Sequence, residues 1–261
     1  MECRMDGRVA AITGGSMGLG RAMAETFAKS GAKVALLARR PEPLAEAKAA
    51  IIAAGGTAEA YSCDVSKQAD IEKTHAAILR DLGPVDILVN NAGASAAKSF
   101  ESITDEEWSF DLELKLFSAI RLTRLVLPGM KQRRWGRIIN VLNTYAKAAG
   151  PNSAPTSVSR AAGMALTKVL AGECAPHTVL VNGLLVGLIE SDQWQRRFKA
   201  QGGNRTYETF LEEFAKERKL PMGRLGTAQE FANIACFLAS DAGSYINGTA
   251  TNVDGGMSPV V

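Results

Sequence analysis

The sequence predicts an α/β fold in which a doubly wound parallel sheet carries helices on both faces. Three observations predict it. Short β-rich runs alternate with longer amphipathic or Ala-rich stretches along the 261 residues. The run 33–38 is nearly all apolar, as expected for a strand that is buried on both faces. A Gly-rich turn follows the first predicted strand and opens the first predicted helix.

The elements follow one another in a regular order. Runs rich in Val, Ile, Leu and Ala predict strands at 9–13, 33–38, 58–63, 87–90, 137–142, 179–184 and 249–253. Helices are predicted between them at 18–29, 41–54, 69–81, 105–133, 153–174 and 228–239. Gly31 ends the first helix, and the pair Gly55-Gly56 ends the second. Repeated strand–helix units need right-handed crossovers, so we expect a single domain over 1–261.

One segment departs from this rhythm. The stretch 190–221 is polar and contains five scattered aromatic residues: Trp194, Phe198, Tyr207, Phe210 and Phe214. This pattern predicts a small helical insertion over one edge of the sheet, which would serve as a substrate lid. Its aromatic residues favour a covered, hydrophobic pocket.

Composition excludes several classes of protein. Hydrophobic residues make up 46% of the chain and charged residues 22%, which is typical of a soluble globular protein. The net charge is only +3, and one basic cluster stands out: Lys131, Arg133, Arg134 and Arg137. We interpret that cluster as a solvated helix end, so no nucleic-acid partner is expected.

The cysteines and the apolar runs narrow the choice further. The four cysteines are far apart and form no CxxC pair, which argues against a zinc module or a disulfide scaffold. No metal-ligand spacing is present, and reduced thiols favour a cytoplasmic location. No apolar run reaches the ~18 residues that span a bilayer, so no membrane partner is expected.

The strongest local signal is the turn Thr13-Gly14-Gly15-Ser16-Met17-Gly18-Leu19-Gly20. Glycines let the backbone approach a pyrophosphate, and the helix N-terminus offers N–H groups to the anion. A structural loop would explain this turn alone. However, Asn90-Asn91-Ala92-Gly93 and Cys63-Asp64-Val65 also end strands. Ligands bind at the carboxyl ends of such strands, so the three motifs together predict a nucleotide site.

These motifs and the closing YINGTATNVDGG resemble the short-chain dehydrogenase/reductase family over almost the whole chain. The likeness is to the branch related to 3-oxoacyl-ACP reductases, which have a Rossmann fold. The resemblance implies that the turn holds the pyrophosphate of a nicotinamide dinucleotide, through Gly14, Ser16, Met17, Gly18 and Leu19. It also implies that Asp64 contacts the adenine, with Val65 beside it, and that Asn91, Ala92 and Gly93 line the adenine–ribose side.

The resemblance also extends to the stretch that follows the sixth predicted strand. There, the family contacts the nicotinamide, and the matching residues are Asn182, Gly187, Leu188, Ile189 and Ser191. Val186-Gly187 stands where the family usually has Pro-Gly. This change removes a rigid φ angle but need not remove the contact.

The end of the second strand predicts which cofactor is used. A carboxylate there would bind a ribose 2′-hydroxyl, whereas this chain has Arg39 and Arg40. Two guanidinium groups suit a 2′-phosphate, so NADP(H) is expected in preference to NAD(H). The alternative is that both arginines only form a solvated helix start.

The residues that usually perform the family's chemistry are replaced. The resemblance implies a catalytic tyrosine, a lysine four residues later, a serine thirteen residues before the tyrosine, and an asparagine on the preceding long helix. This chain has Thr156 at the tyrosine position and Arg160 at the lysine position. Asn143 replaces the serine, and Lys115 replaces the asparagine.

These replacements still allow acid–base chemistry. Arg160 can hold ribose hydroxyls and supply a positive field, and Asn143 can donate a hydrogen bond to a substrate oxygen. Thr156 is too weak an acid to replace a phenol unaided. Lys115 would have a lowered pKa if buried beside Arg160, which makes it a candidate proton carrier. Tyr145 could supply a phenol from the opposite wall.

Each of these positions also has a simpler interpretation. Lys115 could face a subunit interface, Tyr145 could merely line a pocket, and Thr156 could be an ordinary helix residue left after catalysis was lost. Three functions therefore remain open. The first is an NADP(H)-dependent oxidoreductase acting on a carbonyl or secondary alcohol with a non-standard acid–base group. The others are a cofactor-binding but catalytically silent subunit and a non-redox lyase.

The two long helices predicted at 105–133 and 153–174 bear on assembly. The second is rich in Ala and Gly on more than one face, and such helices can pack in a four-helix contact between two subunits. We therefore expect a homodimer, or the homotetramer that the family resemblance implies.

Overall fold

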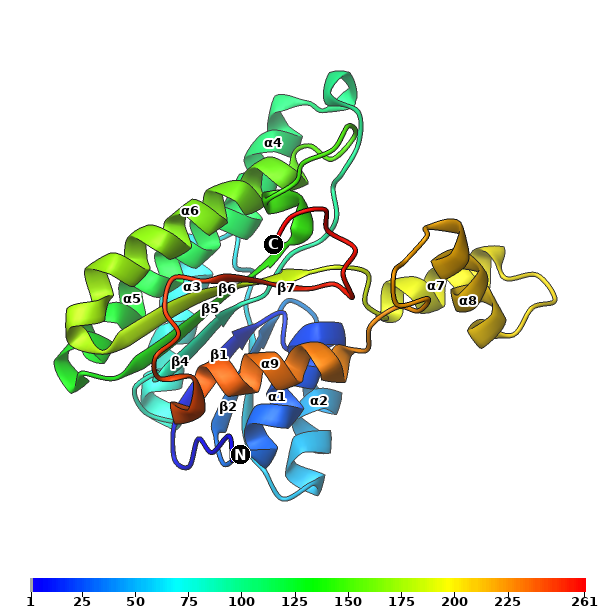
Figure 1. Ribbon diagram of the computed structural model, residues 1–261. Coiled ribbons are helices and arrows are strands. Elements are labelled where there is room, and N and C mark those ends of the chain that lie inside the picture. Colours follow the sequence, from blue (N-terminus) through cyan, green and yellow to red (C-terminus); the bar gives the residue numbers. More distant parts are fainter. Residues whose placement is uncertain (1) are drawn as a thin grey trace.

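The sheet has the predicted parallel, doubly wound topology (Figure 1). The computed structural model describes residues 2–261, apart from the side chains at 192, 193 and 196, so Met1 of the predicted domain lies outside it. Within these residues seven parallel strands are arranged in the order β3-β2-β1-β4-β5-β6-β7. They are β1 (Val9–Thr13), β2 (Lys33–Ala38), β3 (Thr57–Ser62), β4 (Ile87–Asn90), β5 (Gly136–Asn143), β6 (Val179–Val186) and β7 (Ala250–Val253).

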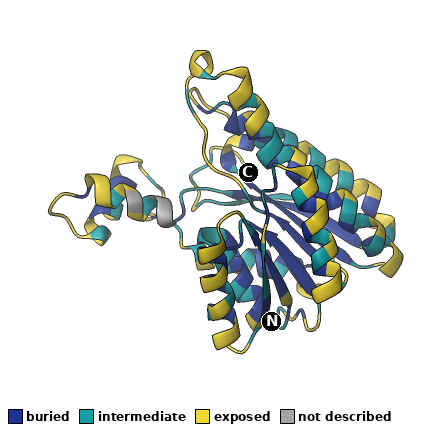
Figure 2. Ribbon diagram, turned by 180° about the vertical axis from the view of Figure 1, so that it is seen from behind, coloured by how far each residue is buried: buried dark blue, intermediate teal, exposed yellow. Residues whose placement is uncertain are grey.

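Helices cover both faces of this sheet, as predicted. Helices α1 (Gly18–Lys29), α2 (Pro41–Ala53) and α9 (Ala228–Ala239) pack on one face. Helices α3 (Gln68–Asp81), α5 (Ser118–Arg133) and α6 (Thr156–Cys174) pack on the other. Figure 2 shows the buried strands between helices whose outer surfaces are exposed.

The apolar strands divide their side chains between the two cores. In β1, Ala10 and Ile12 belong to one core and Val9 and Ala11 to the other, because alternate side chains of a strand point to opposite faces. Each fully buried aliphatic side chain contributes roughly 1.5–3 kcal/mol to folding. Burial on both faces therefore explains why these strands are apolar throughout.

The long predicted helix 105–133 is not continuous. It comprises α4 (Asp105–Leu112), a π-helical turn at Glu113–Phe117, and α5. Thr104 caps α4 through a capping box with Glu107. The helix predicted at 153–174 begins only at Thr156, directly after Pro155. A proline suits the start of a helix but not its interior.

The segment 190–221, called the insertion below, is helical as predicted. It contains α7 (Asp192–Gln201) and α8 (Tyr207–Glu217), which project from the sheet in Figure 1. Phe214 and Ala215 of α8 are buried in a small core of their own with Leu225, and Trp194 of α7 packs against it. The insertion therefore has its own packing and lies close to the ends of the strands.

The interpretation of the basic cluster 131–137 as a solvated helix end is wrong for Arg137. Its side chain is only 2% exposed, lies over the ring of Trp135, and pairs with Asp241 at 3.3 Å. Arg133 pairs with Asp86. Arg133 and Arg137 thus form ion pairs with acidic residues of the same chain.

All four cysteines are free thiols. In the described part of the chain no helix is long and apolar enough to cross a membrane, and no group of His, Cys, Asp or Glu could hold a metal ion.

Candidate active site

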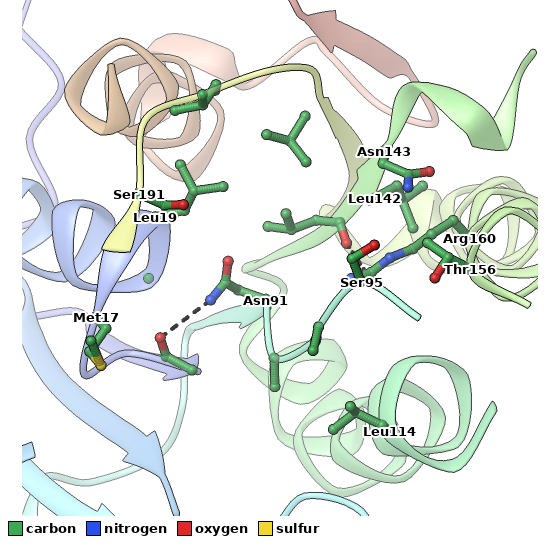
Figure 3. A pocket seen from close by; sticks show the side chains of 18 of the residues that line it. Met17, Leu19, Asn91, Ser95, Leu114, Leu142, Asn143, Thr156, Arg160 and Ser191 are labelled. Atoms are coloured by element: carbon green, nitrogen blue, oxygen red, sulfur yellow. Dashed lines mark hydrogen bonds between the residues drawn. The ribbon is translucent and has the colours of Figure 1, made fainter. Parts of the chain in front are cut away.

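One cleft of about 1000 Å³ lies at the carboxyl ends of the strands. Its walls come from the turns after β1, β2, β3 and β4, from the ends of β5 and β6, from α6 and from the insertion. In Figure 3, Met17, Leu19 and Ser191 lie at one end of the cleft, while Asn143, Thr156 and Arg160 gather at the other. The topology therefore brings both predicted sets of residues to one place.

The turn after β1 is held close to the first turn of α1. A Cβ on Gly20 would lie 2.1 Å from the carbonyl oxygen of Gly14, so only glycine fits there. Gly14 itself has a φ of +66°, which favours glycine. Met17 is the N-cap of α1 and makes no side-chain cap, so the first N–H groups of this helix are available to an anion.

The segment after β4 fastens this turn from the other side. Asn91 donates its side-chain N–H to the Thr13 carbonyl at 2.8 Å. The Thr13 hydroxyl accepts from the backbone N–H groups of Asn91 and Ala92 at 2.8 and 2.9 Å. The side chain of Asn91 therefore fixes the phosphate-binding turn, in addition to lining the cleft.

Arg39 and Arg40 directly follow β2 and line the cleft, as does Asp64. Neither arginine forms an ion pair within 4 Å in the described part of the chain, and Arg40 donates to the sulfur of Met17. Partial burial opposes the charge of Asp64, but hydrogen bonds from Ser66 and the charge of Arg39 leave its pKa lowered. The carboxylate thus stays ionised and is oriented by its own loop.

Most of the residues predicted to bind a cofactor line this one cleft: Gly14, Ser16, Met17, Leu19, Arg39, Arg40, Asp64, Val65, Asn91, Ala92, Gly93, Arg160, Gly187, Ile189 and Ser191. Gly18 is not among the lining residues, but it begins α1 and faces Ser191. Asn182 was placed wrongly by the resemblance, because its side chain is buried in β6 and bonds to Ile246 and Thr249.

Thr156 and Lys115 meet at the other end of the cleft. Lys115 donates from Nζ to Thr156 Oγ1 at 3.0 Å, and the backbone N–H of Ala96 donates to the same oxygen at 3.1 Å. Thr156 lines the cleft, whereas the side chain of Lys115 is only 1% exposed. Lys115 is therefore buried behind Thr156 and reaches the cleft through its hydroxyl.

Two residues that the sequence did not single out complete this group. Asp111 is buried and forms an ion pair with Lys115, four residues later. Its second oxygen accepts from Ser159 Oγ of α6 at 2.7 Å. No local sequence motif marks either residue, because Asp111 and Ser159 lie on different helices and are 48 positions apart in the chain.

The π-helical turn at Glu113–Phe117 contains Lys115 and follows Asp111 directly. Such turns locally interrupt the regular α-helical hydrogen bonding and often occur at functional sites. Here the turn places a charged side chain in the buried contact with α6.

Burial lowers the pKa of Lys115, the bonds and charge of Asp111 oppose this shift, and the charge of Arg160 adds to it. The predicted fall in the pKa of Lys115 is thus confirmed, with Asp111 as an unforeseen opposing partner. Burial likewise lowers the pKa of Arg160 to about 10. Arg160 therefore remains a cation at neutral pH. Its hydrogen bond to the Val141 carbonyl at 2.8 Å and its packing against Gly93 fix its position.

Asn143 and Tyr145 lie on the wall formed by the end of β5. The Oδ1 atom of Asn143 is buried and has no hydrogen-bond partner in the described part of the chain. The Tyr145 side chain lies in a short helical turn, and the residue is 46% exposed. Both residues therefore line the cleft, and the exposed Tyr145 can meet a ligand there.

A phosphate-bearing dinucleotide fits this cleft. The uncapped start of α1 suits its pyrophosphate, and the arginines after β2 suit a further phosphate. Asn143, Thr156 and Arg160 supply polar side chains at the opposite end of the cleft.

The sequence matches a family model described as enoyl-(acyl carrier protein) reductase over residues 14–258. The chain is 36% identical to the 3-oxoacyl-[acyl-carrier-protein] reductase of Escherichia coli K12 over 252 residues, which is 97% of this chain and 98% of the relative. It is 32% identical to the D-beta-hydroxybutyrate dehydrogenase of Cupriavidus necator over 254 residues, which is 97% of this chain and 98% of the relative.

Two similar solved structures contain NADPH. One is the L-sorbose reductase of Gluconobacter frateurii in complex with NADPH and L-sorbose, with a TM-score of 0.93, 34% identity and full coverage of both chains. The other is an NADPH-bound short-chain oxidoreductase of Pseudomonas aeruginosa PAO1 described as containing an atypical catalytic center. It has a TM-score of 0.92, 38% identity and 99% coverage of both chains. This chain therefore belongs to the short-chain dehydrogenase/reductase family of oxidoreductases and resembles its 3-oxoacyl-ACP reductases.

Proposed function

We propose that the protein is an NADP(H)-dependent oxidoreductase that interconverts a carbonyl and a secondary alcohol, using Thr156 and Lys115 as its proton relay. The observation that carries this proposal is the 3.0 Å hydrogen bond between Lys115 Nζ and Thr156 Oγ1 at the wall of the cleft. The NADPH-bound relatives support the choice of cofactor, and Arg39 and Arg40 favour its 2′-phosphate.

The hydrogen bonds around Thr156 determine the direction of proton transfer. A threonine hydroxyl has two lone pairs and one proton. Lys115 and the Ala96 N–H both donate to Thr156 Oγ1. Thr156 Oγ1 therefore accepts two hydrogen bonds, and no described residue accepts the hydroxyl proton of Thr156. That proton is free to bond to a carbonyl oxygen in the cleft.

The bound nicotinamide would supply or accept the hydride. As negative charge develops on the substrate oxygen, Thr156 donates its proton to that oxygen and takes one from Lys115. A lone threonine is a very weak acid, but the lowered pKa of the Lys115 ammonium makes this transfer easier. Arg160 adds a fixed positive charge nearby, and we assign it the contact with the cofactor ribose.

The remaining catalytic residues act on the substrate oxygen and on its surroundings. Asn143 donates from Nδ2 to the same oxygen, which supplements Thr156. Tyr145 lines the cleft near Asn143 and is an alternative proton donor, through its phenol. The insertion covers the cleft as a substrate lid, and reduced cysteines fit a cytoplasmic location.

The test combines cofactor binding with turnover. NADPH and NADH affinities are measured by fluorescence, and reduction is assayed over a panel that includes ketoses and 3-oxoacyl thioesters. We expect tighter binding of NADPH and turnover of at least one carbonyl compound. Thr156→Val should then lower kcat by about 100-fold or more with NADPH affinity unchanged, while Thr156→Ser retains most of the activity.

The alternatives give different results in the same assays. NADPH binding without turnover across the panel favours the catalytically silent subunit. Turnover that needs no added nucleotide favours the lyase. Wild-type activity in Thr156→Val would rule out the relay itself.

A further inference from the structure

The insertion brings two arginines to the cleft that the cofactor assignments leave unused. Arg197 lies on α7, and Arg218 follows α8 directly. Both are exposed and line the cleft. Among the described residues neither forms an ion pair within 4 Å, and Asp64 is the one carboxylate in the lining. The cleft therefore carries a marked excess of positive charge at this wall.

An aromatic platform holds both guanidinium groups. Phe214 is buried, and its ring centroid lies 4.5 Å from that of Trp194. The guanidinium carbon of Arg197 lies 4.9 Å from the Phe214 centroid, and that of Arg218 lies 5.4 Å from it. Stacking on a ring orders a guanidinium group without using its N–H donors. Apart from Arg197 Nε, which donates to Gln201, the N–H groups of both guanidinium groups therefore remain available for a ligand.

Arg205 of the same insertion shows the contrast. It also lies over an aromatic ring, that of Phe210, at 5.3 Å. However, it pairs with Glu213 at 2.7 Å and donates to the carbonyls of Gln201 and Gly202. It does not line the cleft. Arg205 therefore stabilises the insertion with most of its guanidinium group. Arg197 uses only Nε, which donates to Gln201 Oε1 at 3.1 Å, and no side-chain hydrogen bond is seen for Arg218 among the described residues.

We propose that Arg197 and Arg218, stacked on Phe214, form an oxyanion-binding site at the insertion end of the cleft. The site takes a carboxylate or phosphate group, because the unused terminal N–H groups of two guanidinium groups match the paired oxygens of such groups. One source is an acidic carbonyl substrate, and this assignment rests on the function proposed above. The other source is the pyrophosphate of the cofactor. Anion binding itself requires neither turnover nor a particular substrate.

The experiment compares two double variants with the same loss of charge. Arg197→Gln with Arg218→Gln removes the proposed site. Lys199→Gln with Lys216→Gln is the matched control, because both lysines are exposed, lie on the same two helices and do not line the cleft. NADPH affinity is measured by fluorescence. The affinity of the NADPH-saturated protein for inorganic phosphate is measured by calorimetry at constant ionic strength.

Two results support the site and identify its ligand. For a substrate oxyanion, the NADPH-saturated wild type binds phosphate, the arginine double variant binds it at least tenfold more weakly, and NADPH affinity is unchanged. For the cofactor pyrophosphate, NADPH affinity falls at least tenfold in the arginine double variant and not in the lysine control. If the two double variants behave alike in both measurements, the site does not exist. A catalytically silent protein gives the same readouts, so this failure is distinct from failure of the oxidoreductase proposal.

Discussion

Thr156, Lys115, Asp111 and Ser159 form one connected group of hydrogen bonds and charges. A buried lysine without a partner would be strongly destabilising, and Asp111 provides the opposite charge for Lys115. Ser159 then satisfies the second oxygen of Asp111. Thr156 lies between this buried pair and the cleft, so its hydroxyl connects them. The group therefore has the connections that the proposed proton relay requires.

The pH dependence of the reaction should reflect the pKa of Lys115 and the effect of Asp111 on it. The proposed relay requires a protonated Lys115 for reduction. The rate should therefore fall as the pH rises through the pKa of Lys115, which burial lowers below the ordinary lysine value. Asp111 raises that pKa. Asp111→Asn should therefore move the alkaline limb of the kcat profile to lower pH. The measurement is kcat for NADPH-dependent reduction between about pH 6 and 10.

Glu113, on the π-helical turn that contains Lys115, provides a control for this experiment. Glu113 bonds to Arg121 and does not line the cleft, so Glu113→Gln should leave the profile unchanged. Circular dichroism establishes that Asp111→Asn is folded. A profile for Asp111→Asn that coincides with that of the wild type would show that Lys115 is not the titrating acid.

For single residues, the sequence predicts which positions line the site better than it predicts which side chains contact one another. Thr156, Arg160, Asn143 and Lys115 were found because their spacing follows the family's pattern along the chain. Asp111 and Ser159 were missed because their contact depends on the π-helical turn and on how α4 and α6 pack. Neither feature has a marker in local sequence. The buried Arg137 was missed for the same reason, since its partner Asp241 is distant in the chain.

At the scale of elements, the turn between β1 and α1 is the part on which cofactor binding most depends. Gly20→Ala would bring a methyl group to 2.1 Å from the Gly14 carbonyl oxygen and 2.7 Å from Asn91 Nδ2. Since both neighbours belong to the fixed turn, α1 must move. We expect NADPH affinity to fall at least tenfold and stability to fall by about 1–3 kcal/mol.

Fluorescence titration and urea unfolding measure these two effects. Gly150→Ala is the control, because a Cβ at that position meets nothing within 4 Å. It should match the wild type in both assays. Unchanged NADPH affinity in Gly20→Ala would mean that the turn does not contact the cofactor.

Element boundaries were predicted where local chemistry defines them. Strands β1, β2 and β4 and helices α1 and α9 match the predicted ranges, because apolar runs and turn residues mark their ends. The interruption of the helix 105–133 was not predicted, since the amphipathic pattern continues through the π-helical turn. The two helices of the insertion could be predicted as helical, but their arrangement depends on contacts with Phe214 that sequence alone does not specify.

On the scale of the whole molecule, the cleft joins two differently built walls. The strand ends form a rigid wall whose position follows from the sheet topology, so it could be predicted from the sequence. The insertion adds Trp194, Arg197, Phe214 and Arg218, which meet only in three dimensions. Cofactor recognition is therefore more accessible to sequence reasoning than substrate recognition, which depends on this second wall.

Subunit assembly should involve the helices that also form the site. Phe110, Phe117, Val158 and Val169 are exposed apolar residues on α4, the π-helical turn and α6. Scattered exposed apolar residues are normal, but these lie on helices that pack together. We therefore expect a homodimer or homotetramer that buries this face. Because α6 also carries Thr156 and Arg160, the same contact would stabilise the position of the relay.

Analytical ultracentrifugation at micromolar concentration tests this assembly. Val169→Glu should shift the protein toward smaller species, because a buried, unpaired carboxylate is unfavourable in an apolar contact. Ile52→Glu is the matched control, since Ile52 is 51% exposed on α2 and Val169 is 55% exposed on α6. The control should sediment as the wild type does. A wild-type protein that sediments as a monomer, or equal effects of the two substitutions, would contradict an interface on α6.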